Sequence, residues 1–161
     1  MRGRAVSVSV VSVALALFLA GTGWGEPLQK KSLSLEDARK AGAAAAVEAK
    51  KNKWNVAIAV VDDGGYLLHF ERLDETQVAS VDIAIGKART AVIFKRPSKV
   101  LEDAVAGGRT ALLALKDLTP LEGGLPILID GKVAGGIGVS GVKSSEDAQV
   151  AKAGVDALTL K

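Results

Sequence analysis

The chain contains no cysteine, one histidine, one methionine and few aromatic residues. Without cysteine it cannot form disulfides, iron–sulfur clusters, thiolate metal sites or a cysteine nucleophile, and it cannot carry a lipid through a cysteine. Because His69 is the only histidine, a metal site built from several histidines is excluded as well. The fold must therefore be held together by the burial of apolar groups alone.

The first 25 residues differ in character from the rest. Arg2 and Arg4 form a basic start, residues 6–20 are apolar but too few to span a bilayer comfortably, and small residues follow. This pattern predicts a secretory signal peptide over residues 1–25. We therefore expect a periplasmic or extracellular protein without a stable membrane span, in which a flexible segment, residues 26–32, precedes one domain, residues 33–161.

The overall charge is close to balanced. The sequence has 21 basic and 18 acidic residues, and removal of residues 1–25 takes away two arginines and no acid. The formal charge then falls from +3 to +1. Nucleic-acid binding needs a concentrated Lys/Arg surface, so the composition argues against a nucleic-acid partner.

The apolar patterns predict helices and two hairpins. Helices are expected from Ser34 to about Asn52, over 77–94, from Ser98 and from Ser144, and the first is built from small residues. In the first hairpin, strand 56–61 pairs with strand 66–72. In the second, strand 125–129 pairs with strand 132–139. In the first hairpin we expect Tyr66, Leu68 and Phe70 to share one face, opposite to Leu67, His69 and Glu71. Residues 110–118 are compatible with either a strand or a helix. This order predicts an α+β domain whose antiparallel sheet packs between helices.

Glycine is concentrated in the second hairpin. Asp130-Gly131 suits a tight turn with positive φ angles, whereas Gly135, Gly136 and Gly138 weaken a strand unless a helix or ligand approaches closely. Residues 136–141 also match the dinucleotide-binding fingerprint. The βαβ unit that gives this fingerprint its meaning is not predicted, which argues against nucleotide binding.

Candidate chemistry centres on His69. A zinc deaminase requires two cysteines that the chain lacks, and no Gly-x-Ser-x-Gly motif indicates a serine hydrolase. Haem needs an apolar slot, one axial donor and cations for its propionates. His69 or Tyr66 can supply the donor and thus the metal ligand, and the candidate cations are Arg72, Lys87, Lys95 and Arg96.

Seven short runs resemble the GlcG/HbpS family, which also forms the C-terminal domain of PduO-type proteins. The runs are 33–41, 56–65, 72–74, 80–88, 94–98, 123–127 and 135–141. The resemblance implies a profilin-like α/β/α sandwich around an antiparallel sheet, and homo-oligomers. It also implies haem binding in some members, a redox partner for exported members, and an association with glycolate or corrinoid metabolism for others.

The family's polar positions fall on residues of this chain without identifying a catalytic one: Arg72, Asp74, Ser80, Asp82, Lys87, Pro97, Gly123, Gly124 and Asp147. The usual Arg-Met-Asp-Gly-Ala is replaced by residues 72–76, Arg-Leu-Asp-Glu-Thr, so no methionine sulfur is present there to bind haem iron.

Three hypotheses follow. The leading one is an exported haem-binding protein with His69 or Tyr66 as axial donor and Arg72 or Lys87 pairing with the propionates. The second is an enzyme that places Asp82, Lys87 and Arg72 around a small acid, in a pocket made by the glycine-rich hairpin. The third is an oligomeric partner module without a small ligand. For a bound small molecule, the predicted contacts also include Arg96, Gly123 and Gly124.

Overall fold

The computed structural model describes residues 25–159, so the predicted signal peptide lies outside the described residues except for Gly25. The elements follow one another as α1 (Leu35–Lys51), β1 (Ala57–Asp62), β2 (Leu67–Arg72), α2 (Ser80–Ile93), α3 (Ser98–Ala106), the 3₁₀ helix η1 (Thr110–Ala114), β3 (Gly124–Ile129), β4 (Lys132–Ser140) and α4 (Ser144–Thr159). Within residues 25–159, no helix is long and apolar enough to cross a membrane.

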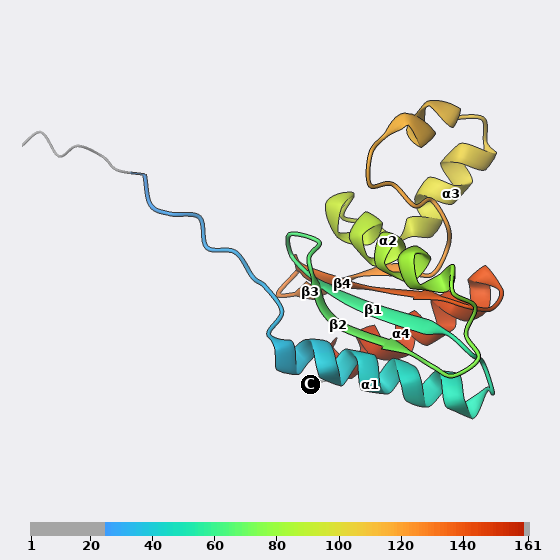
Figure 1. Ribbon diagram of the computed structural model, residues 1–161. Coiled ribbons are helices and arrows are strands. Elements are labelled where there is room, and N and C mark those ends of the chain that lie inside the picture. The colour runs from blue at the N-terminus through green and yellow to red at the C-terminus, as the bar shows by residue number, and fades with distance from the viewer. Residues whose placement is uncertain (1–24, 160–161) are drawn as a thin grey trace, which may run out of the picture.

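The four strands form one antiparallel sheet in the order β2-β1-β4-β3. Helices α1 and α4 cover one face and pack against each other, and α2 covers the other face (Figure 1). Helix α3 and η1 extend beyond α2, away from the sheet (Figure 1). The predicted α+β sandwich around an antiparallel sheet is therefore confirmed.

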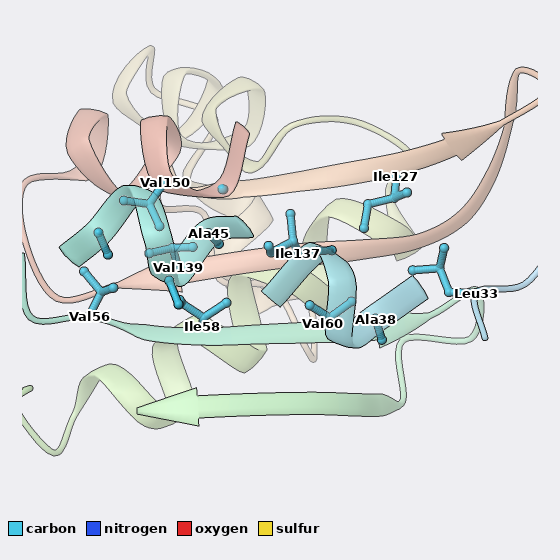
Figure 2. Close-up of a cluster of buried hydrophobic side chains, with 14 of the residues drawn as sticks. Leu33, Ala38, Ala45, Val56, Ile58, Val60, Ile127, Ile137, Val139 and Val150 are labelled. Carbon is cyan, nitrogen blue, oxygen red and sulfur yellow. The ribbon is translucent and has the colours of Figure 1, made fainter. Parts of the chain in front are cut away.

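Helix α1 packs closely on the sheet because its buried positions are all alanine or glycine, namely Ala38, Ala41, Gly42, Ala45, Ala46 and Ala49. Its start is fixed by a capping box in which Ser34 and Asp37 bond each other's backbone N–H. Alternate residues of β1, including Ile58 and Val60, project into the cluster between the sheet and this helix (Figure 2). Short side chains on α1 thus meet branched ones on the strand.

The glycines of β4 admit α2. A Cβ atom at Gly138 would collide with the carbonyl oxygen of Ala84 in α2, and one at Gly136 would lie 3.0 Å from the carbonyl oxygen of Ala88. At Gly136 and Gly138 the reason for glycine is therefore a helix backbone, whereas a Cβ at Gly135 would collide with Leu33 and the carbonyl of Val61. The turn between β3 and β4 has φ angles of 50° at Asp130 and 72° at Gly131, as expected from Asp-Gly.

The structure corrects the predicted alternation in the first hairpin. Val60 pairs with His69 and Val61 pairs with Leu67, so Leu68 is an extra residue in a β-bulge. Leu68 therefore packs with the cluster under α1, whereas Phe70 packs with the cluster under α2. Leu68 and Phe70 do not share a face, because a bulge shifts the alternation by one residue.

The start of α2 also differs from expectation. Helix α2 begins at Ser80, three residues after the predicted start, because residues 77–79 form a turn. Residues 110–118, which the sequence leaves undecided between strand and helix, form η1 and then irregular chain.

We expect Gly138→Ala to destabilise the protein by about 2 kcal/mol or more, because the added methyl group meets backbone atoms that cannot move independently. The control is Gly64→Ala, whose Cβ would meet only side-chain atoms of Tyr66 and Asp62, at 3.1 Å or more, and which should change stability by less than about 1 kcal/mol. Urea unfolding of both variants measures the difference. Equal stabilities would contradict the account of the α2–β4 contact.

Candidate functional site

His69 lies on β2, which is an edge strand of the sheet. Its Nε2 atom is buried and has no hydrogen-bond partner among the described residues. The imidazole packs directly on Gly42 of α1, where a Cβ atom would lie 2.6 Å from Nε2. A buried polar atom without a partner costs about 1–3 kcal/mol, so this nitrogen needs a partner that residues 25–159 do not supply.

The surroundings of His69 contain one further charged pair. Glu71 lies two residues along the strand, and its carboxylate is 3.9 Å from the amine of Lys50 on α1. Tyr66 precedes the strand, and its side chain is 71% exposed. We call this group, Gly42, Lys50, Tyr66, His69 and Glu71, the β2-edge site. It offers one imidazole and one phenol as metal donors, beside one cation.

Arg72 does not belong to the β2-edge site in this structure. It pairs with Ala57, whose side chain packs under α2, so Arg72 projects from the opposite face of the sheet to His69. Asp82 is exposed on the first turn of α2. Neither side chain forms an ion pair with another residue of the range 25–159, so the two are not joined to each other.

Lys87 is enclosed in the protein. Its amine donates to Asp147 Oδ2 at 2.8 Å and to the carbonyl oxygen of Val139 at 2.9 Å, and both charged side chains are 2% exposed. Gly123 and Gly124 wrap around this pair, because a Cβ at Gly123 would lie 3.0 Å from Lys87 Nζ and one at Gly124 would collide with the Lys87 carbonyl. The structure thus brings together Lys87, Gly123 and Gly124, with Asp147 as their centre.

Asp147 joins α4 to the rest of the domain. Burial raises the pKa of its carboxyl, and the hydrogen bond from Lys87, the charge of Lys87 and the N–H of Val142 act in the opposite direction. The N–H of Val142 donates to Oδ1 at 3.2 Å. Because both carboxylate oxygens accept from protein donors, the pair stabilises the junction of α2, α4 and the glycine-rich hairpin rather than facing a ligand. The small-acid arrangement of Lys87, Asp82 and Arg72 is not formed.

Lys95 and Arg96 lie at the other edge of the sheet from His69. Both follow α2, are exposed, and line a hollow with residues of β3 and α4. They are therefore not placed to serve a ligand held by His69 within the same chain. Groups of three or more potential metal-binding side chains of the His, Cys, Asp and Glu types do not occur among residues 25–159.

Two features of the β2-edge site are absent from the sequence-based prediction. Gly42 is one of the buried positions on the side of α1 that faces the sheet, where alanine would also fit the pattern. Glycine inside a helix costs roughly 1 kcal/mol relative to alanine, so the sequence gives no local reason for it. This cost is the available signal for a close approach, here by His69. The pair of Lys50 with Glu71 has no sequence signal, because it depends on how α1 crosses β2.

We expect Lys87→Met to destabilise the protein by about 3–5 kcal/mol, because it leaves the Asp147 carboxylate buried without its partner. The double variant Lys87→Met/Asp147→Leu should lose clearly less than the sum of the two single variants, because it removes both charges. Urea unfolding of the four proteins completes the cycle. Additive losses would show that the two groups do not stabilise each other.

The chain is similar to known proteins across most of its length. A family model described as "Haem degrading protein HbpS-like" matches residues 33–156. Protein GlcG of Escherichia coli K12 is 47% identical over 98 residues, which are 61% of this chain and 73% of GlcG.

Two solved structures share the fold. A double mutant of HbpS from Streptomyces reticuli is 34% identical with a TM-score of 0.78, over 96% of this chain and 99% of that one. A PduOC:Heme complex is 28% identical with a TM-score of 0.71, over 78% of this chain and 94% of that one. Since the family model spans nearly all of the domain and the fold agrees with these structures, the chain belongs to the HbpS-like family.

Proposed function

We propose that this protein binds haem at the β2-edge site, with His69 Nε2 as the axial ligand of the iron. The proposal is supported by the haem held in the PduOC complex and by the family's description as haem-degrading. The observation that carries it is the buried Nε2 atom, which has no hydrogen-bond partner among the described residues. Such an atom gains a favourable interaction when a metal binds it, whereas a packing residue would not need a nitrogen there.

The donor chemistry of the residues fits the group. A haem needs one axial side chain, and His69 is the only histidine of the chain. Gly42 admits the imidazole itself, because a Cβ there would collide with its Cδ2, so iron reaches Nε2 only when the ring or α1 moves. Lys50 of α1 lies beside β2 through its pair with Glu71, and it takes the propionate role that the sequence assigns to Arg72 or Lys87. Bound haem supplies an iron with a redox couple and an open coordination position, while His69 holds that iron.

Tyr66 is the alternative donor. Its side chain is exposed and its ring lies beside Gly64 in the turn before β2, so its phenol is open to solvent and is not covered by α1. A phenolate is an established axial ligand of haem iron. The two donors give different predictions on substitution.

A haem titration of the protein and of His69→Ala, followed by the Soret absorbance, tests the proposal. We expect saturable binding by the protein and at least about a tenfold weaker affinity for His69→Ala, the change that corresponds to roughly 1.4 kcal/mol. Tyr66→Phe tests the alternative donor, and with His69 as the ligand it should bind haem as the unmodified protein does.

Circular dichroism of both variants shows whether the fold is retained. If His69→Ala binds haem as tightly as the unmodified protein does, His69 is not the ligand. Loss of binding in Tyr66→Phe alone would transfer that role to Tyr66. If the unmodified protein shows no saturable Soret change, the haem proposal itself fails.

Export and assembly belong to the same proposal. The signal peptide predicted over residues 1–25 supports an exported protein, and the family resemblance supports a homo-oligomer with a redox-sensing partner. One observation favours self-association: the arm formed by α3, η1 and the chain up to residue 121 exposes four large apolar side chains, Val100, Leu113, Leu115 and Leu121. Because this arm stands away from the sheet (Figure 1), a second copy can cover it.

We expect Leu113→Glu to reduce the oligomer to a smaller species, because a charge would be buried in an apolar interface. Val47→Glu is the control, since Val47 is also exposed, at 67%, but lies on α1. Light scattering after size-exclusion chromatography gives the molar mass of each. Unchanged mass in Leu113→Glu together with a reduced mass in Val47→Glu would place the interface on α1.

A further inference from the structure

Among the hollows at the edge of the sheet opposite His69, two adjoin at Lys95. One has a volume of about 590 Å³ and the other about 530 Å³, and both are lined by Lys95 and Leu128. Each is within the range of known small-molecule pockets, about 300–1,000 Å³. We call the two hollows together the β3-edge groove.

The floor of the β3-edge groove is apolar. Leu125, Pro126 and Leu128 come from β3, and Val155 comes from α4. Leu128 is 46% exposed, although it lies in a strand of the core sheet. An apolar floor of this kind favours a ligand with an apolar body over a fully hydrated ion.

The rim of the groove is cationic. Lys95, Arg96 and Lys132 line it, and none of them forms an ion pair with another residue of the range 25–159. The described chain as a whole does not share this charge: 18 of the 21 basic residues and all 18 acidic residues lie in the range 25–159. The described part of the chain is thus formally neutral, and three unpaired cations at one groove are complementary to an anion.

The other charged side chains that line the two hollows are already paired within the chain. The pairs are Lys30 with Asp63, Lys31 with Asp130, and Lys152 with Asp156. Each acid at the rim is thus offset by a neighbouring lysine, which leaves the three unpaired cations as the net charge of the groove.

The edge strand itself is not suited to a peptide. Pro126 lies in the middle of β3 and has no N–H group to donate to an added strand. Strand addition at this edge is therefore interrupted, whereas a small ligand needs no regular backbone pairing. The groove is suited to a small molecule rather than to an extended chain.

We propose that the β3-edge groove binds an amphipathic carboxylate of the fatty-acid type. Its apolar chain lies on Leu125, Leu128 and Val155, and its carboxylate lies beside Lys95 and Arg96. The site is separate from the β2-edge site, because β2 and β3 are opposite edges of the sheet. Haem shares the combination of an apolar body and carboxylates, so the experiment must separate the two ligands.

The probe is cis-parinaric acid, a fatty acid whose fluorescence rises in an apolar environment. We expect saturable binding to the protein and at least a tenfold higher dissociation constant for Lys95→Gln/Arg96→Gln. The matched control is Lys116→Gln/Lys143→Gln, which removes the same charge from exposed lysines outside the groove and should bind as the unmodified protein does. Leu128→Asp, at a half-exposed position, should abolish binding.

His69→Ala separates this proposal from haem binding, because it should leave parinarate binding unchanged while weakening haem. Far-ultraviolet circular dichroism checks that each variant is folded. The proposal is overturned if the groove variant and the control variant bind parinarate within twofold of each other, or if the unmodified protein does not bind it saturably. It is also overturned if His69→Ala loses parinarate binding, since the fatty acid would then occupy the β2-edge site.

Discussion

The close contact between α2 and β4 is the constraint on which the rest of the structure depends. Because Gly136 and Gly138 carry no side chains, the helix backbone rests on the strand, and Lys87 of α2 reaches through to Asp147 of α4. That ion pair joins α2 to α4, which packs against α1 on the far face. In a chain without disulfides, the close contact between α2 and β4 and the buried Lys87–Asp147 ion pair thus connect the two faces of the sheet.

A second consequence of close packing lies at the edges of the sheet. Helix α1 approaches β2 through Gly42 and thereby encloses one side of His69, while α2 ends beside β3 and leaves Lys95 and Arg96 in solvent. The domain thus has a rigid, fully packed centre and two chemically different edges. One edge carries a nitrogen donor and the other carries cations around apolar side chains, so ligand chemistry is expected at the edges.

Most of the fold follows from local sequence signals. Three local signals are met in the structure. Asp130-Gly131 adopts the positive φ angles of a tight turn, Ser34 caps α1, and the glycines of β4 allow close approach by neighbouring segments. The bulge at Leu68 has no such signal, because it depends on how β1 and β2 pair. The candidate site is harder to predict for the same reason. In the sequence, Lys87 is a candidate cation for binding a ligand. Only the tertiary structure shows that its amine is buried in an ion pair with Asp147.

The central claim is that the single imidazole of this chain is the iron ligand, and one spectrum tests it directly. Because His69 is the only histidine, ¹⁵N-histidine labelling gives the ring signals of one residue. The account predicts that zinc protoporphyrin, a diamagnetic stand-in for haem, shifts the Nε2 resonance strongly in proportion to the amount bound. Bound porphyrin with an unchanged Nε2 resonance would contradict the account.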